Sequence, residues 1–236
     1  MISVVHKAAE RGHFNFGWLD TRHSFSFGRY YNPERMEFGK LRVLNDDIVK
    51  GGAGFESHPH DNMEIVSIPL RGAMEHRDSM GNGTIINTGD VQLMSAGAGI
   101  VHSEFNHSRT EDLNFLQIWV RPLERDITPR YDQKTFMRSD RINQIQTVVA
   151  PEQGRNTIKI NQQAWFSLAA LEQGRRVEYQ THAPGTGLYA FVIEGAADVA
   201  NIQLHKRDAV ALSDFSEVGI EALEDCDLLL IEVPMD

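Results

Sequence analysis

Short apolar segments separated by turn residues run through the whole chain, and they leave few folds open to it. Four of these runs have the composition of β-strands, at 41–44, 65–70, 91–94 and 115–120. Clusters rich in glycine, asparagine and aspartate interrupt them, at 45–47, 51–54, 79–83 and 88–90. Strands that recur every ~8 to 12 residues between turns are typical of antiparallel barrels and sandwiches. The sequence therefore predicts an all-β protein made of antiparallel strands.

The second half of the chain repeats features of the first half. Gly72-Ala73 has a counterpart in Gly195-Ala196, and the segment 90–95, which opens with aspartate and ends with serine, has one in 208–213. Internal repeats of this kind indicate two copies of one folding unit. We therefore expect two units rather than one large sandwich. The charged segment 121–146 has no clean period, and we interpret it as a solvated crossover between them.

Charge and composition limit the partners and the compartment. The 23 Lys and Arg residues are outnumbered by 33 Asp and Glu residues, for a net charge of −10, so the overall field repels nucleic acid and acidic membranes. A single cysteine, Cys226, excludes an internal disulfide. The N-terminal residues have no apolar run typical of a signal peptide, and no segment is apolar over a bilayer's thickness. We expect a cytoplasmic monomer that binds neither nucleic acid nor membrane directly.

Two pairs of ligand-type side chains share one spacing. His58 and His60 flank a proline, and His102 and Glu104 flank a serine. In an extended backbone, residues two apart point to the same face, so each pair presents two ligand atoms together. If the two segments lie side by side in a sheet, three imidazoles and one carboxylate converge. This donor set suits one divalent metal such as Fe(II), Ni, Co, Mn or Zn, and leaves coordination positions open for substrate or dioxygen.

Glu64 has three alternative roles at this stage. It follows His60 by four residues and shares its face if the strand continues without a bulge. It could then be a ligand, a partner that orients an imidazole, or a general base, and we favour the orienting role. The second half lacks a comparable set. In the repeat alignment the positions of His58, His60 and His102 are occupied by other residue types, namely Thr181, Ala183 and Ile220.

Further motifs surround the ligand pairs in a fixed order. They are Trp18-Leu19-Asp20, His23-Ser24-Phe25-Ser26-Phe27 and the segments 41–47, 58–64, 95–104 and 128–131. Together they resemble the pirin family, and most closely its bacterial members within the cupin superfamily. The resemblance implies a bicupin of two antiparallel, jelly-roll-like β-barrel domains. An N-terminal metal-binding cupin domain would cover residues 1–135, and a C-terminal cupin-like domain without metal would cover 136–236. It also implies one metal, usually iron, held by the residues that match the family's ligands, His58, His60, His102 and Glu104.

Two functions of different classes follow from the resemblance. Some bacterial members are similar to quercetin 2,3-dioxygenases, oxidoreductases that open the ring of a flavonol with O2 and release CO. Other members are metal-containing regulators that bind a transcription factor or an enzyme. We expect the dioxygenase, with Fe(II) as its metal and Ni, Co, Mn, Cu or Zn as alternatives. Glu104 is our preferred base for the flavonol 3-hydroxyl and Glu64 the reserve. The alternative is a redox-sensing regulator with a protein partner.

Overall fold

Glycine turns end equivalent strands in the two halves of the chain, as the sequence repeat predicts. A computed structural model describes residues 1–236. In it, β6 (Glu64–Arg71) ends at Gly72 with φ +83°, and β17 (Thr186–Glu194) ends at Gly195 with φ +77°. Only glycine adopts this backbone region readily. A Cβ at Gly195 would also lie 2.0 Å from the Asp225 carbonyl oxygen. Both the backbone conformation and the lack of space therefore exclude larger residues from the second turn.

The first unit is built from a seven-stranded sheet and a four-stranded sheet. In spatial order the larger sheet consists of β12 (Arg130–Thr135), β9 (Asp90–Ser95), β6, β11 (Leu113–Val120), β4 (Leu41–Val49), β3 (Leu19–His23) and β2 (Gly12–Asn15). The smaller consists of β5 (Gly54–His60), β10 (Ile100–Asn106), β7 (Ala73–Asp78) and β8 (Gly83–Asn87). All neighbouring strands in both sheets are antiparallel, which confirms the predicted strand class.

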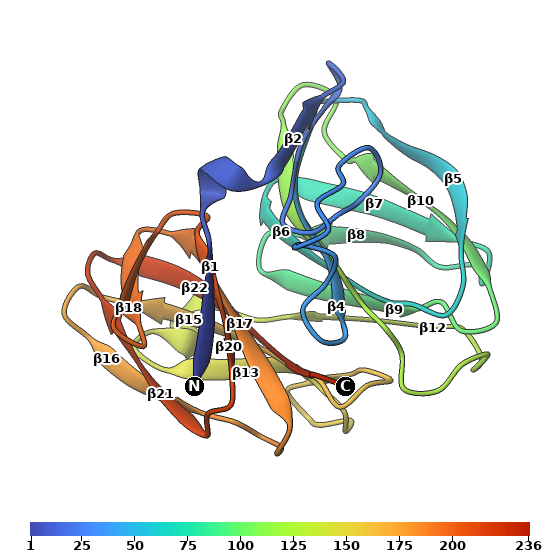
Figure 1. Cartoon of the computed structure of the whole chain (residues 1–236). Coiled ribbons are helices and arrows are strands. Elements are labelled where there is room, and N and C mark those ends of the chain that lie inside the picture. Colours follow the sequence, from blue (N-terminus) through green and yellow to red (C-terminus); the bar gives the residue numbers. More distant parts are fainter.

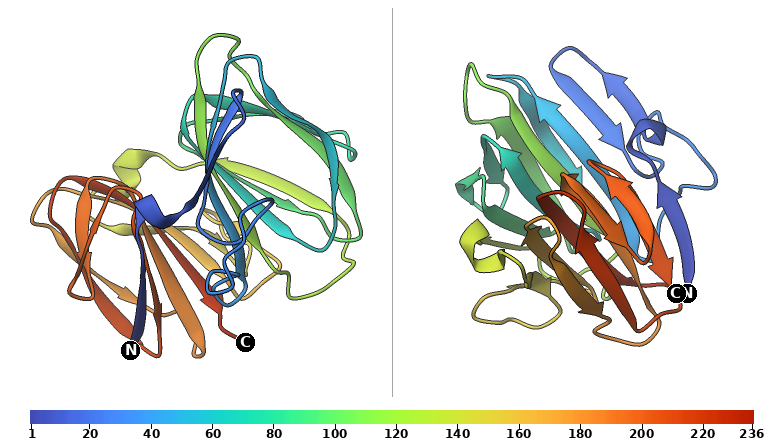
Figure 2. Two further views of the ribbon diagram at one scale, coloured as in Figure 1. Left: turned by 45° about the horizontal axis from the view of Figure 1, so that its top comes forward. Right: turned by 90° about the vertical axis from the view of Figure 1, so that its left-hand side faces the viewer.

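The second unit repeats this arrangement strand for strand over most of its length. Its larger sheet consists of β1 (Ile2–His6), β20 (Ala209–Ser213), β17, β22 (Cys226–Pro234), β15 (Trp165–Leu171), β13 (Ile145–Ala150) and β14 (Ile158–Lys159). Its smaller sheet consists of β16 (Arg176–Gln180), β21 (Glu217–Ala222), β18 (Ala196–Val199) and β19 (Ile202–His205). In each unit the hydrogen-bonded strands form two separate sheets. The closed barrels implied by the family resemblance are therefore not seen, and each unit is a two-layered sandwich (Figure 2).

The two units exchange their edge strands. The N-terminal strand β1 pairs with β20 of the second unit, although the rest of the N-terminal half lies in the first (Figure 1). The connecting segment contributes β12, which pairs with β9 of the first unit. Two short 3-10 helices, η1 (Ala8–Glu10) and η2 (Arg138–Arg141), follow β1 and β12 where the chain passes between the units. Neither they nor any other helix could cross a membrane.

The largest apolar core lies between the units. It contains 26 buried residues, contributed by both seven-stranded sheets, such as Val66 and Ile118 from the first and Phe166 and Tyr189 from the second. The interior of the second sandwich is a separate apolar cluster of 17 residues. The interior of the first sandwich has only two small apolar clusters, of 6 and 4 residues. The interior of the first unit therefore has room for several polar side chains, whereas the interior of the second is mainly apolar.

Candidate metal centre

Two neighbouring strands of the smaller first sheet position three histidines. His58 and His60 lie on β5, and His102 lies directly opposite His58 on the antiparallel strand β10. β5 is an edge strand, so the missing N–H of Pro59 removes no hydrogen bond that the sheet needs. The proline keeps the segment extended, and both histidines therefore point to the same face.

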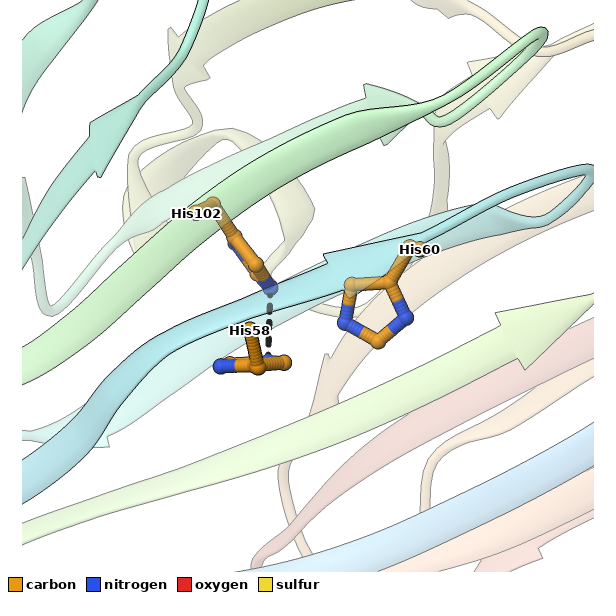
Figure 3. A group of neighbouring side chains, drawn as sticks. All are labelled: His58, His60 and His102. Carbon is orange, nitrogen blue, oxygen red and sulfur yellow. Dashed lines mark hydrogen bonds between the residues drawn. The ribbon is translucent and has the colours of Figure 1, made fainter.

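The three imidazoles meet at one point. His58 Nε2 and His102 Nε2 are 3.0 Å apart, and the centroid of the His60 ring lies 4.9 Å from that of His58 and 4.8 Å from that of His102. One nitrogen of each ring lies within 4.8 Å of the others. Figure 3 shows the three side chains directed toward a common space between the strands. His102 is buried, and the other two are partly exposed, so the cluster can be reached from solvent.

The protonation of the cluster favours metal binding. His58 Nδ1 lies 2.7 Å from the Glu56 carbonyl oxygen, which can only accept, so Nδ1 carries the proton and Nε2 presents its lone pair to the cluster. Burial, with a contribution from His58, lowers the pKa of His60 to about 4. Burial and the neighbouring imidazoles lower the pKa of His102 to about 2. At neutral pH both rings are therefore uncharged and able to ligate.

Glu104 lies beside the histidines on β10. It is buried, its Oε2 accepts a hydrogen bond from Gln117 Nε2 at 2.8 Å, and Ser67 Oγ lies 3.4 Å from Oε1. One of its oxygens lies within 4.8 Å of ligand nitrogens of His102 and His76. Burial raises the pKa of Glu104, against the effect of the Gln117 hydrogen bond and the nearby imidazoles. A cation in the cluster would hold this carboxyl group in its ionised form.

His76 is closer to the centre than the sequence indicated. Its position before 79–83 predicts a place near a turn or the surface and makes it a candidate for orienting the metal ligands, and in the structure its side chain is fully buried on β7, opposite Glu104. Its Nε2 lies 3.2 Å from Asp78 Oδ2, while its Nδ1 has no hydrogen-bond partner. The residue lies two positions before the end of β7 and so is near the turn, but β7 extends to Asp78 and directs the side chain inward rather than to the surface.

The residues present fit a divalent metal. The Nε2 atoms of His58 and His102 face each other at 3.0 Å, an approach that a cation shared by both rings would stabilise. Three imidazoles beside a carboxylate form the mixed nitrogen and oxygen set that Fe, Ni, Co, Mn and Zn accept.

Glu64 lies away from the cluster. The chain leaves β5 at His60, turns through Asn62 with φ +48°, and enters β6 in the other sheet at Glu64. The carboxylate accepts hydrogen bonds from Ser95 Oγ at 2.8 Å and from the backbone N–H of Asn161 at 3.1 Å. Glu64 therefore connects the first unit to the second. We expect Glu64 beside His60 only if one strand runs through both residues, and the turn at Asn62 interrupts that strand.

Sequence reasoning missed the polar residues that hold Glu104. Gln117 lies in the apolar segment 115–120, and Ser67 lies in the apolar segment 65–70. Both are buried, and Ser67 Oγ donates a hydrogen bond to Gln117 Oε1 at 2.8 Å. A polar residue in the middle of a core strand is a usable signal, because it is buried at a cost unless it has a partner.

Comparison with known proteins places the chain in a family. The family model described as Pirin matches residues 4–120, and the one described as Quercetinase C-terminal cupin domain matches residues 147–233. A quercetin 2,3-dioxygenase of Escherichia coli K12 is 40% identical over 230 residues, which are 98% of this chain and 98% of that protein. The chain belongs to the pirin family.

Other relatives agree with this assignment. The crystal structure of the bacterial pirin YhhW from Escherichia coli, in complex with nickel(II), matches with a TM-score of 0.94 and 39% identity over 100% of both chains. A pirin-like protein of Caulobacter vibrioides is 35% identical over 222 residues, which are 94% of this chain and 95% of that protein.

The second unit of this pirin has other residue types at the positions of the histidines. When Gly72 and Gly195 are aligned, strand pairing places Val199 at the position of His76 and its partner Ile220 at that of Glu104. The same pairing places Val218 and Tyr179 at the positions of His102 and His58, with Thr181 at that of His60. The repeat alignment that placed Thr181, Ala183 and Ile220 at the positions of His58, His60 and His102 was therefore offset by two residues on these strands. None of these side chains is an imidazole or a carboxylate.

A buried carboxylate organises this part of the second unit. Glu232 is fully buried and accepts hydrogen bonds from Tyr179 Oη at 2.7 Å, from Thr186 Oγ1 at 2.6 Å and from His182 Nδ1 at 2.8 Å. The His182 ring stacks on Trp165, with centroids 4.8 Å apart. Burial by itself would raise the pKa of Glu232, but the hydrogen bonds together lower it below its ordinary value. The folded protein therefore prefers the ionised carboxylate.

Replacing Glu232 by glutamine should destabilise the pirin in a pH-dependent way. The amide keeps the shape but leaves buried donors poorly matched, so we expect a loss of about 2 to 4 kcal/mol at pH 7. Because the folded-state pKa is lowered, the carboxylate contributes its stability above its unfolded pKa and loses it as pH falls through the folded value. Urea unfolding measures the free energy of unfolding at pH 7 and at pH 3.5, which is about one unit below the unfolded pKa of glutamate. The exposed Glu224→Gln variant is the control. If the stability difference between wild type and Glu232→Gln were the same at both pH values, the ionised state of Glu232 in the folded protein would be contradicted.

Proposed function

We propose that the chain is a metal-dependent dioxygenase that opens the ring of a flavonol such as quercetin with O2 and releases CO. The observation that carries this proposal is the convergence of three imidazoles beside a buried carboxylate, at a place that solvent can reach. Relatives named quercetin 2,3-dioxygenase that match nearly the whole chain support the same activity.

His58, His60, His102 and Glu104 are the proposed ligands of one metal ion. His102 is central, since its ligand nitrogens lie within 4.8 Å both of the other two histidines and of the group formed by His76 and Glu104. We propose Fe(II), with Ni, Co, Mn, Cu and Zn as alternatives, because mixed imidazole and carboxylate sets do not select among these ions by donor type alone. The nickel(II) in the related YhhW structure supports a divalent ion.

Glu104 is the proposed base. When bound, the metal supplies a Lewis acid for the oxygens of the substrate and a redox centre for O2. Glu104 accepts the proton of the flavonol 3-hydroxyl at its carboxylate, and its burial makes that carboxylate more basic than an exposed one. The amide of Gln117 holds the carboxyl group in place, and the hydroxyl of Ser67 orients that amide. Glu64, with its hydrogen bonds to the second unit, is better placed for a structural role.

Aromatic side chains beside the cluster support a flat aromatic substrate. The ring of Trp119 packs edge-on against that of His60, with centroids 4.9 Å apart, and against that of Phe27 at 5.3 Å. All three residues are partly exposed. A planar flavonol can contact such rings over a large apolar area.

We also propose that the two units are cupin domains, the first with metal and the second without. The similar strand order of their sheets supports this bicupin arrangement, and in the second unit the positions of the three histidines are occupied by Tyr179, Thr181 and Val218. The strand exchange makes residues 1–135 and 136–236 an approximate division, because Ile2–His6 pairs with the second unit.

Protein loaded with Fe(II) should consume O2 and release CO in equal amounts when quercetin is added. Oxygen electrode readings and CO binding to haemoglobin measure the two gases, with the metal-free and nickel-loaded proteins run in parallel. Metal-free protein should be inactive. Fully metallated protein that releases no CO, and that instead changes its affinity for a protein partner with the oxidation state of the metal, would replace the enzyme by the redox-sensing regulator.

A further inference from the structure

A cleft between the two units carries an excess of positive charge. Its volume is about 810 Å³, within the range of small-molecule sites, and none of its lining residues belongs to the histidine cluster. Five of the lining residues are basic, Arg11, Arg22, Arg71, Lys206 and Arg207, and two are acidic, Asp46 and Glu194. A local excess of cations is unexpected in a chain whose net charge is −10.

Arg11 is the buried centre of this cleft. It lies between η1 and β2, on the segment that connects the two units, and its side chain is 2% exposed. Its Nε and Nη1 have no hydrogen-bond partner, and only Nη2 approaches a carboxylate, at 3.5 Å from Asp46 Oδ2. The Phe191 ring, 5.6 Å away, partly compensates the charge. A buried guanidinium with two unpartnered nitrogens is costly unless a ligand completes its hydrogen bonds.

The single carboxylate beside Arg11 is already shared. Asp46 Oδ2 also lies 3.1 Å from Nε of Arg207, and Asp46 Oδ1 accepts a hydrogen bond from Asn114 Nδ2 at 2.8 Å. Arg207 has a second carboxylate, Glu194, at 3.9 Å from its Nη2, whereas Arg11 has only the shared Asp46, so the charge of Arg11 is the less compensated of the two. Each nitrogen of Arg207 already has a partner, because Nε pairs with Asp46, Nη1 donates to the Ile193 carbonyl and Nη2 donates to Asn114 Oδ1. Arg11 is thus the guanidinium left for a ligand.

A second guanidinium is free where the cleft meets solvent. Arg71, at the end of β6, is exposed and has no ion pair or side-chain hydrogen bond in the structure. The other two basic lining residues are neutralised, Lys206 by Glu194 at 2.8 Å and Arg22 by Asp20 at 2.9 Å. The unused cationic groups are therefore one buried arginine and one exposed arginine.

We propose that this cleft binds a small metabolite through an oxyanion group, a phosphate or a carboxylate, held by Arg11 and Arg71. The planar fork of a guanidinium matches both oxyanions with two parallel hydrogen bonds. A ligand here contacts the connector between the units, the first large sheet and the turn before β20 at once. It therefore joins the two units, and this role is independent of the dioxygenase proposal.

Thermal unfolding of the full chain, titrated with inorganic phosphate or with succinate, tests the site. Sodium chloride at matched ionic strength separates binding from screening. Wild type should show a saturable rise in Tm of about 5 to 10 °C at a hundredfold excess over Kd. Arg11→Gln should lose the rise, Arg71→Gln should weaken the affinity by about tenfold, and the exposed Arg125→Gln, outside the cleft, should behave as wild type.

Each outcome of these titrations either supports or overturns the proposed oxyanion site. A saturable rise with phosphate only, or with succinate only, supports the site and identifies its oxyanion. If Arg11→Gln does not fold, equilibrium dialysis of labelled phosphate and succinate against wild type and Arg71→Gln provides the same comparison. A rise that sodium chloride reproduces, or one that is unchanged in both the Arg11 and Arg71 variants, overturns the proposal. Because the histidine cluster is intact in every variant, binding at a metal would persist in all of them and would count as that second result.

Discussion

Replacing His102 by alanine should remove almost all of the metal from the protein. His102 is the buried member of the three-histidine cluster, and it alone also belongs to the group with Glu104. Loss of residues that merely orient ligands lowers metal affinity by about 10- to 100-fold, so loss of this ligand should exceed a hundredfold. Elemental analysis after dialysis against a weak chelator measures the occupancy.

The matched control for this variant is His107→Ala. His107 follows the same strand, is exposed and lies outside the cluster, so its removal should leave the occupancy unchanged. His58→Ala should behave like His102→Ala, since the two Nε2 atoms face each other at 3.0 Å. Near-normal metal content in both cluster variants would show that the metal is bound elsewhere.

Replacing Glu104 by glutamine should abolish most turnover of quercetin at saturating metal. The amide keeps the contact with Ser67 and the volume of the side chain but cannot accept a proton, and general bases of this kind contribute about 10²- to 10⁴-fold to the rate. The measurement is the rate of CO release per bound metal ion, so that lost metal is not mistaken for lost chemistry.

Glu64→Gln is the control for the base. Its carboxylate is buried like that of Glu104 but hydrogen-bonds Ser95 and Asn161, so the variant should lose stability and keep its turnover per metal ion. A rate that falls with Glu64→Gln and not with Glu104→Gln would reverse the assignment of the base.

Local patterns in the sequence predicted the strands that carry the fold. The apolar segment 65–70 became β6, and the glycine after it supplies the positive φ of the turn. The segment 121–146 was interpreted as a solvated crossover, yet it contains β12. Its side chains are mostly half-buried and show no alternation, because β12 is specified by the unpaired edge of β9 and not by its own sequence. No local pattern reveals that β1 pairs with β20.

Local patterns in the sequence also predicted part of the candidate site, and contacts between distant segments were again missed. Spacing by two on an extended backbone places His58 and His60 on one face whatever the rest of the fold does. The inference about Glu64 failed because it crossed a turn, at Asn62, that no periodicity marks. The partners of Glu104 come from β6 and β11, in the opposite sheet, and contacts between sheets are set by packing rather than by sequence spacing.

The exchange of β1 and β12 affects the order in which the protein can be completed during synthesis. β1 leaves the ribosome well before its partner β20, since Ile2 pairs with Ser213. At ~5 to 20 residues per second the strand waits roughly 10 to 40 s for that partner. Once β12 has been translated, the first unit can close, whereas the larger sheet of the second unit still lacks β20. Completion of that second sheet therefore requires translation of both units.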